Sequence, residues 1–153
     1  MGYKRAGCKI VAANDIDPEM AWHYKRNINP PIYYLCPIAD LIKAKLPDEL
    51  FNLDILDGSP PCSTFSMAGS REKAWGKNKK FREGQATQVL SDLFFDYLNL
   101  VDRLRPRVAI AENVKGMILG NAKGYTKLVM ARFKEIGYRV QLFLLKKKII
   151  LLF

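Results

Sequence analysis

Residues 85–111 read QATQVLSDLFFDYLNLVDRLRPRVAIA, and this stretch decides the fold class of the chain. Apolar residues recur within it at steps of three and four, which predicts an amphipathic helix over Gln85–Arg105. Pro106 ends this helix, because proline lacks the N–H that a continuing helix needs. The residues that follow, Arg107–Ala111 (RVAIA), are typical of a buried strand. The stretch therefore predicts a helix that packs on a sheet and leads directly into one of its strands.

The alternation of strands and helices continues on both sides of this stretch. Asp17 followed by Pro18 predicts the start of a helix that ends near Arg26, since aspartate caps helices and proline suits the first helical position. Residues 122–136 predict a further helix, which Gly137 ends. Other strands are predicted at Lys9–Asn14, Phe51–Leu56 and Tyr138–Leu145. We therefore expect an α/β fold: a mostly parallel sheet with right-handed crossovers and helices on both faces.

Length and composition fit one globular domain and exclude several classes of protein. The chain has 153 residues, of which 49% are hydrophobic and 26% are charged, so it is neither disordered nor a disulfide scaffold. Its three cysteines include no C-x-x-C pair, which favours a reducing compartment, the cytoplasm, and argues against a zinc site. Its apolar runs are far shorter than the ~20 residues that span a bilayer. We expect no bound metal and no membrane association.

Positive charge is concentrated in two short segments. The net charge is +10, and the segment Arg71–Arg82 alone holds six basic residues and one acidic residue. Lys146–Lys148 add three more positive charges. Clustered positive charge favours a polyanionic partner, with nucleic acid first. The alternative is a solvated lysine-rich loop without a partner.

Polar residues follow three of the predicted strands. They are Asp15, the run Asp57–Cys62, and the pair Glu112 and Asn113. Ligands of parallel sheets bind outside the carboxyl ends of the strands. We therefore expect these residues to converge on one rim of the sheet.

Cys62 and Glu112 are the candidate catalytic residues on this rim. Pro60 and Pro61 fix the backbone before Cys62, and a rigid turn that presents a thiol suits a nucleophile. The alternative for Cys62 is a small buried apolar side chain. Glu112 can protonate or hold a ring nitrogen, or it can stabilise the start of the following segment as a helix-dipole partner.

Two other carboxylates are candidates for contacts with a cofactor. Asp15 ends the first predicted strand, where an acidic side chain commonly accepts hydrogen bonds from ribose hydroxyls. It could equally be an ordinary turn residue, and no G-x-G-x-x-G precedes it. Asp40 could contact an adenine amino group or lie in an exposed loop.

The combination of motifs resembles the DNA (cytosine-5) methyltransferase family. Pro60-Pro61-Cys62, followed about fifty residues later by Glu112-Asn113-Val114, resembles the nucleophile and glutamate motifs of that family. Asn14–Asp17, Ala39–Leu41 and Leu93–Phe95 resemble its cofactor motifs, in the family's order. The resemblance runs from about Cys8 to Leu145. It implies a Rossmann-like core that takes S-adenosylmethionine and acts on double-stranded DNA, in restriction-modification or a similar pathway.

The resemblance also implies a role for each matching residue. Cys62 would attack carbon 6 of a flipped-out cytosine, and Glu112 would hold ring nitrogen 3. The residues that it implies for cofactor binding are Asp15, Ile16, Asp40, Leu41, Pro60 and Leu93. The candidates for nucleic-acid binding are Ser66, Arg71, Lys73, Lys77, Lys79, Lys80 and Arg82.

The sequence departs from the family pattern at both ends. The family's opening strand and glycine-rich D-L-F-x-G-x-G-G loop are absent here, so we expect residues 1–145 to be a partial, truncated catalytic core with an open sheet edge. Residues 146–153, an atypical basic and apolar tail, resemble no family motif. We expect the isolated chain to be inactive and to self-associate or need a complementing polypeptide. The alternatives are a non-catalytic remnant that binds DNA or cofactor weakly, and an RNA cytosine-5 methyltransferase.

The basic segment Arg71–Arg82 predicts weak DNA binding without sequence preference. Because counterion release drives such binding, log affinity should fall linearly with log salt concentration, with a slope of about −0.9 per phosphate contacted. Fluorescence anisotropy of two labelled duplexes of unrelated sequence measures this slope. An affinity that does not change with salt, or that differs strongly between the duplexes, would contradict the prediction.

Overall fold

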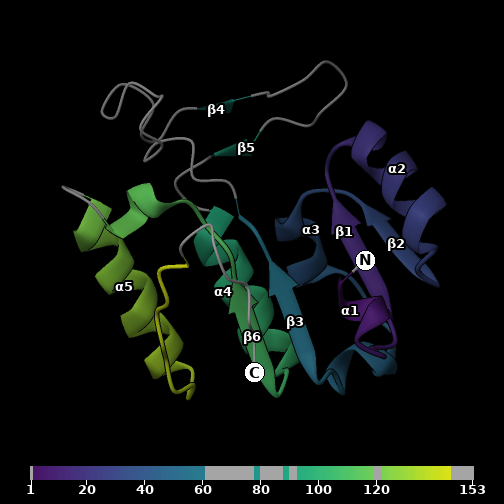
Figure 1. The fold of residues 1–153 in the computed structure, drawn as a ribbon. Helices are drawn as coiled ribbons and strands as arrows, with labels where there is room; N and C mark the ends of the chain where they lie inside the picture. The colour runs from purple at the N-terminus through teal and green to yellow at the C-terminus, as the bar shows by residue number, and fades with distance from the viewer. Residues whose placement is uncertain (1, 61–77, 80–87, 90–92, 119–121, 146–153) are drawn as a thin grey trace.

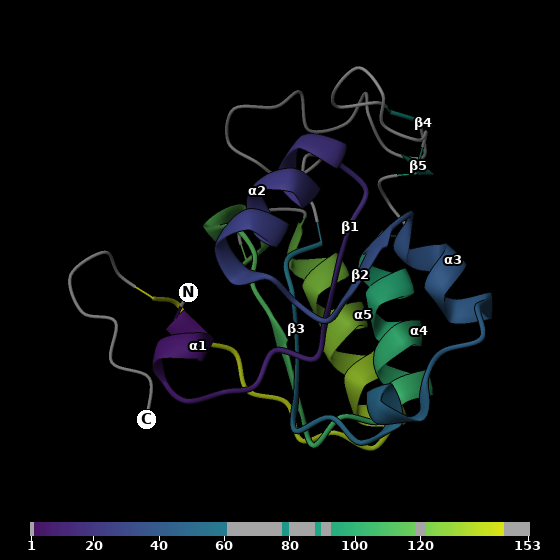
Figure 2. The same ribbon diagram turned by 90° about the vertical axis from the view of Figure 1, so that its right-hand side faces the viewer.

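The computed structural model describes residues 2–60, 78–79, 88–89, 93–118 and 122–145. Its parallel strands form a central layer between two layers of helices (Figures 1 and 2). Helices α1 (Gly2–Arg5) and α2 (Pro18–Ile28) lie on one side. Helices α3 (Ile38–Lys43), α4 (Leu93–Leu104) and α5 (Ala122–Glu135) lie on the other. The expected α/β architecture with helices on both faces is confirmed.

The first parallel pair joins strands β1 (Ala12–Asp15) and β2 (Ile32–Leu35). Helix α2 connects them and begins as predicted, with Pro18 at its start and Asp17 as its N-cap. The Asp17 carboxylate accepts hydrogen bonds from the backbone N–H of Glu19 and Met20, which satisfies two otherwise unpaired donors. The helix ends at Asn29, whose φ of 52° is the left-handed conformation that stops a helix.

The second parallel pair joins strands β3 (Ile55–Gly58) and β6 (Val108–Ala111). Helix α4 packs behind it, with seven buried residues on one stripe: Leu93, Phe94, Tyr97, Leu98, Leu100, Val101 and Leu104. The Tyr97 hydroxyl shares its proton between the carbonyl oxygens of Leu56 and Ile110, at 3.0 and 2.8 Å. One side chain of α4 therefore ties both strands of this pair to the helix.

Two apolar clusters hold the helices to the strands. In the first, α4 and α5 meet through residues such as Leu98, Val129 and Phe133. In the second, Leu100 and Leu104 of α4 pack on Leu41 of α3 and on Leu50, which lies in the short 3₁₀ helix η1 (Asp48–Phe51). Each large apolar side chain buried this way contributes roughly 1.5–3 kcal/mol. Helix α4 belongs to both clusters and is thus the centre of the core.

Helix α5 runs from Ala122 to Glu135 and is followed by Gly137, whose φ of +94° ends the helix as predicted. The expected strand Tyr138–Leu145, however, is wrong. Within the described residues, the backbone of this segment contributes one hydrogen bond outside regular elements, from Tyr138 N–H to the Phe133 carbonyl oxygen. Apolar composition favours a strand only where a neighbouring edge accepts its hydrogen bonds. Here Leu142, Phe143, Leu144 and Leu145 stay exposed.

The predicted start of the long helix at Gln85 is also wrong. Gln88–Val89 form strand β5, which pairs antiparallel with β4 (Asn78–Lys79), and the helix begins at Leu93. Apolar spacing over so short a stretch does not distinguish a strand from a helix. Pairing with Asn78 and Lys79 makes Gln88 and Val89 a strand. The predicted strands Lys9–Asn14 and Phe51–Leu56 exist but begin later in the chain, as β1 and β3.

Several elements lack a sequence prediction, among them strand β2 and helix α3. Strand β2 (Ile32–Leu35, IYYL) follows Pro30-Pro31, and helix α3 follows Pro37. The β-branched and aromatic residues of β2 are a usable strand signal. In place of one sheet, the described strands form two parallel pairs, β1–β2 and β3–β6, and the short antiparallel pair β4–β5.

Gly58→Ala tests the packing of α4 on β3. A Cβ at position 58 would lie 2.5 Å from Cε2 of Tyr97, so we expect the substitution to destabilise the chain by about 1–3 kcal/mol. The matched control is Gly124→Ala in α5, where a Cβ meets nothing within 4 Å. This change should be neutral or stabilising by up to ~1 kcal/mol, because alanine favours helices. Urea denaturation of both variants measures the difference, and equal stabilities would contradict the packing.

Candidate active site

Two hydrogen bonds bring the segment after β6 against the segment after β3. The Glu112 backbone N–H donates to the Gly58 carbonyl oxygen at 2.9 Å, which extends the ladder between the strands by one step. The Asn113 side-chain amide then donates to the Pro60 carbonyl oxygen, also at 2.9 Å. The Glu112 backbone is therefore anchored beside the segment that leads to Cys62, as the expected rim requires. Cys62 itself follows Pro60 by two residues and lies outside the described residues.

The Asp57 carboxyl is the second acidic group on this rim. Burial of the carboxyl raises its pKa above the ordinary value of 3.8, and the nearby negative charge of Glu112 raises it further. Hydrogen bonds from the Tyr3 hydroxyl and the Gly58 backbone act in the opposite direction and lower it. An acidic residue thus stands at the end of each strand, Asp57 in β3 and Glu112 directly after β6, and the two charges interact.

Asp15 ends β1, the third element of the rim. One of its carboxylate oxygens, Oδ1, accepts a hydrogen bond from the Asp17 backbone N–H at 2.9 Å, which turns the chain into α2. Among the described residues, no hydrogen-bond partner takes the other oxygen. The phenol of Tyr33 lies nearby, and its pKa is raised to about 12 by burial and by the charge of Asp15. The turn thus fixes the orientation of the Asp15 carboxylate at the end of β1.

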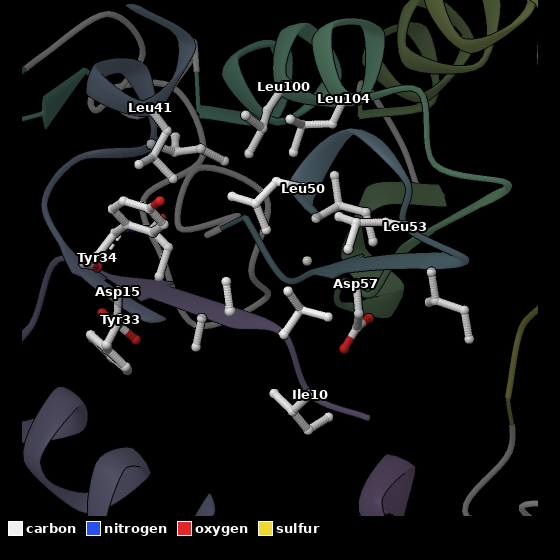
Figure 3. A pocket seen from close by; sticks show the side chains of 18 of the residues that line it. Ile10, Asp15, Tyr33, Tyr34, Leu41, Leu50, Leu53, Asp57, Leu100 and Leu104 are labelled. Atoms are coloured by element: carbon white, nitrogen blue, oxygen red, sulfur yellow. Dashed lines mark hydrogen bonds between the residues drawn. The ribbon is translucent and has the colours of Figure 1, made fainter. Parts of the chain in front are cut away.

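A cavity of about 1060 Å³ opens between β1 and β3, and Figure 3 shows the side chains around it. Asp15 and Asp57 point into it from the two strands. Five of the six residues expected to bind a cofactor line this cavity: Asp15, Ile16, Leu41, Pro60 and Leu93. Leu41 and Leu93 do so as members of the core, each 5% exposed.

Asp40 is the residue of this set that does not line the cavity. It lies in the first turn of α3, where its side chain is exposed and its charge raises the pKa of the Cys36 thiol together with burial, the larger cause. Its neighbour Leu41 points into the core, and residues on successive helical positions face different directions. The structure therefore gives Leu41 and Asp40 different surroundings.

The nucleic-acid candidates fall almost entirely outside the described residues. Ser66, Arg71, Lys73, Lys77, Lys80 and Arg82 are among the positions that the structure does not describe. Lys79 lies in β4 and pairs with Gln88 of β5. This pairing connects the basic segment to the residues that precede α4.

Two residues that position the site were not singled out from the sequence. Tyr97 crosses behind β3 and β6, and Tyr3 reaches from α1 to the Asp57 carboxyl. A tyrosine on an apolar helix stripe is typical of a buried core residue, so the sequence does not indicate a separate role for Tyr97. Tyr3 lies in a short helix far from Asp57 in sequence, and only the fold brings the two together.

The described part of the chain holds neither a metal-binding cluster nor a membrane-spanning helix. In residues 2–60, 93–118 and 122–145, together with 78–79 and 88–89, no group of three or more histidine, cysteine, aspartate or glutamate side chains could hold a metal ion. No helix in the same part of the chain is long and apolar enough to cross a membrane.

Comparison with known proteins identifies the family. A family model described as C-5 cytosine-specific DNA methylase matches residues 1–150, so the chain belongs to this family. The type II methyltransferase M.FnuDI of Fusobacterium nucleatum is 30% identical over 140 residues, which cover 92% of this chain and 36% of that protein. The type II methyltransferase M.NgoPII of Neisseria gonorrhoeae is 30% identical over 142 residues, or 93% and 37% of the two chains.

A phage protein extends the comparison. The orphan methyltransferase M.Rho11sI of Bacillus phage rho11s is 38% identical over 112 residues, which cover 72% of this chain and 19% of that protein. The chain therefore matches between 19% and 37% of the length of these relatives. The resemblance seen in the sequence motifs is confirmed at the level of the family.

Two substitutions with opposite effects test the arrangement of the rim. Glu112→Gln should lower the pKa of Asp57, because it removes a negative charge that disfavours ionisation. Tyr3→Phe should raise that pKa, because it removes a hydrogen bond to the ionised carboxyl. NMR titration of the Asp57 carboxyl carbon measures both shifts. If the Asp57 pKa is unchanged in Glu112→Gln, the two carboxylates are not neighbours.

Proposed function

We propose that this chain is the catalytic part of a DNA cytosine-5 methyltransferase of the restriction-modification type. The observation that carries the proposal is the pair of bonds Glu112–Gly58 and Asn113–Pro60. They join the glutamate motif to the segment that leads to Cys62, and so they favour a thiol and a carboxylate that act on one base. The family assignment supports the same reaction class.

Cys62 is the nucleophile in this proposal. Carbon 5 of cytosine is too weakly nucleophilic to take a methyl group directly. Addition of the Cys62 thiolate to carbon 6 makes the ring an enamine, in which carbon 5 becomes nucleophilic. Glu112 holds and protonates ring nitrogen 3 and so offsets the charge that develops on the ring. Loss of the carbon 5 proton and of the thiolate then restores the aromatic ring.

The cavity beside the rim suits S-adenosylmethionine, which supplies the methyl group when bound. Asp15 offers a carboxylate oxygen to the ribose hydroxyls, and Ile16 offers an apolar surface for the adenine. Pro60 and Leu93 line the same cavity. Asp40 is a weaker candidate for the adenine amino group, because it lies outside the cavity lining.

Double-stranded DNA is the proposed partner. A base inside a duplex cannot reach a thiol at the end of a strand, so the target cytosine must be flipped out, at a cost of a few kcal/mol. The basic segment Arg71–Arg82, which directly follows the nucleophile motif, would contact the phosphates. Cys8 and Cys36 are free thiols, and a DNA-modifying enzyme of this kind would work in the reducing cytoplasm.

A chimaeric enzyme tests the proposal. Residues 8–145 replace the aligned region of the Fusobacterium methyltransferase, and tritium transfer from labelled S-adenosylmethionine to duplex DNA is measured. We expect transfer by the chimaera and none from the isolated chain. Cys62→Ser should abolish transfer, and Glu112→Gln should reduce it by about 10²-fold or more. Lys115→Gln, an exposed change near the rim, is the matched control and should leave transfer intact.

Two results would contradict the proposal. The first is a chimaera that keeps full transfer after Cys62→Ser, since the chemistry would then lie elsewhere. The second is a chimaera that folds and binds S-adenosylmethionine but transfers no methyl group, which would favour a non-catalytic remnant.

A further inference from the structure

Helix α2 presents an unbroken run of exposed residues between its two buried positions. Ala21 and Ile28 are 4% and 6% exposed, whereas residues 22–27 are all exposed. Figure 1 shows α2 at the margin of the molecule, with no described helix or strand on its outer side. Trp22 keeps 55% of its surface open, although tryptophan is a highly buried residue on average. Packing within the described chain therefore does not account for a tryptophan at this position.

Cationic and aromatic side chains gather around this tryptophan. The guanidinium carbon of Arg26, Cζ, lies 5.3 Å from the centroid of the Trp22 ring. The His23 ring meets the same ring edge-on, with 4.8 Å between centroids. Lys25 Nζ lies 4.9 Å from the centroid of the Tyr33 ring in β2. Because side chains three and four positions apart are neighbours on a helix, Lys25 and Arg26 both flank Trp22, and we call Trp22, His23, Lys25 and Arg26 the α2 patch.

Aromatic rings, and not carboxylates, hold the two cations of the α2 patch. Among the described residues, none of the ion pairs includes Lys25 or Arg26. A cation–π contact orients a guanidinium without neutralising its charge, so its N–H groups stay available to an anion. The acidic residue of the helix, Glu19, lies in the first turn, whereas the two cations lie in the last. The patch therefore offers positive charge directly beside an open aromatic ring.

The α2 patch is separate from the cavity that we assign to the cofactor. Met20 and Tyr24 are the residues of α2 that line the cavity, and none of the four patch residues does. The patch is also distinct in sequence from the basic segment Arg71–Arg82. A ligand on the outer side of α2 would therefore leave the cofactor cavity open.

An open indole beside two cations matches the chemistry of a nucleic-acid strand, in which each planar base is followed by a phosphate. A base that stacks on an exposed aromatic ring strengthens binding by about tenfold or more. Arginine and lysine N–H groups bind the phosphate oxygens through charge-assisted hydrogen bonds. An acidic peptide would supply the negative charge but no planar ring beside each charge. The combination therefore favours nucleic acid over an acidic protein.

The exposed ring favours a single strand over a duplex. Inside a duplex, neighbouring pairs cover both faces of each base, so no face is open to an indole. Recognition of a duplex by a helix would instead need polar side chains that reach the base edges. The exposed Asn27 is a residue of this kind in α2, but its side-chain amide donates to the His23 carbonyl oxygen at 2.8 Å.

We propose that the α2 patch is a binding site for single-stranded DNA, with one base stacked on Trp22 and the adjoining phosphates bound by Lys25 and Arg26. DNA is favoured over RNA because the chain belongs to a family of DNA methylases. Since stacking reads no base edges, the site has no strong sequence preference. The inference does not depend on methyl transfer, because none of the patch residues takes part in the proposed reaction.

NMR titration of the full chain with a thymidine octamer tests this proposal. The Trp22 indole N–H and the backbone amides of Lys25 and Arg26 report on the patch separately from any binding at the basic segment. The variant Trp75→Phe leaves Trp22 as the one tryptophan and so identifies its indole signal. We expect saturable shifts of these signals. For two phosphates on a single strand, the affinity should fall with salt at a log–log slope of about −1.4.

Two further ligands separate base stacking from charge. An abasic octamer keeps the phosphates but has no rings, and a long duplex covers both faces of nearly all its bases. At equal phosphate concentration, each should bind the α2 patch about tenfold more weakly than the thymidine octamer, or worse. If either ligand binds the patch as tightly as the octamer, base stacking on Trp22 is excluded.

Paired substitutions test the ring and the charge separately. Trp22→Ala should weaken octamer binding at the patch by about tenfold or more, and Trp22→Phe, which keeps a ring, should weaken it less. Arg26→Gln should weaken binding and reduce the salt slope by about 0.7. The matched control, Lys134→Gln, removes the same charge from an exposed position of α5 and should leave binding at the patch unchanged. Unchanged signals from β3 and β6 report that each variant is folded.

Three outcomes would overturn the proposal. The octamer could shift signals of the basic segment, such as that of Lys79, and leave the α2 patch unchanged. A uridine octamer of RNA could bind the patch about tenfold more tightly than the DNA octamer, in which case RNA is the ligand. Lastly, a peptide of glutamate and tyrosine could bind the patch as tightly as the octamer, which would make an acidic protein the partner.

Discussion

Parallel pairing between β3 and β6 is the interaction on which the rest of the structure depends. Its register, from Ile55 opposite Val108 to Gly58 opposite Ala111, decides which side chains face α4 and which face away. If β3 slipped by one residue along β6, Leu56 would turn out of the core and Ile55 would turn in. Tyr97 opposes such a slip, because its hydroxyl binds a carbonyl oxygen on each strand and its ring occupies the space above Gly58. The register is therefore set jointly by the two strands and by one helix.

The same register builds the rim. Because Gly58 stands opposite Ala111, the next residue on each strand, Ser59 and Glu112, leaves the sheet at the same level. The bond from Asn113 to Pro60 continues this alignment beyond the last ladder pair. The segments that carry the two motifs, about fifty residues apart in sequence, thus meet through the Glu112–Gly58 and Asn113–Pro60 hydrogen bonds. On the other side of the cavity, β1 brings Asp15 to the same end of the molecule, although the described strands leave β1 and β3 unpaired with each other.

How far the sequence predicts this structure depends on whether the deciding contact is local. Asp17-Pro18 and Gly137 mark helix ends through their own backbone preferences, and both predictions are confirmed. Residues 138–145 have strand-like composition, but a strand also needs a neighbour, which no local pattern reveals. The rim was predictable because parallel strands end together, whereas the contact of Tyr3 with Asp57 arises only from the fold. The roles of Asp15, Cys62 and Glu112 in binding and catalysis remain proposals that rest on motifs and on this shared rim.

A cross-linking measurement tests most directly whether positions 62 and 112 share one pocket. In a chain with Cys8→Ser and Cys36→Ser, Glu112→Cys is paired with Cys62 and treated with a bifunctional thiol reagent about as long as a pyrimidine ring. The account predicts an intramolecular cross-link between positions 62 and 112, detected by mass spectrometry. It predicts none for the control Glu135→Cys, whose exposed side chain lies at the last residue of α5. If both thiols react with a monofunctional reagent but positions 62 and 112 do not cross-link, the two residues cannot act on the same base.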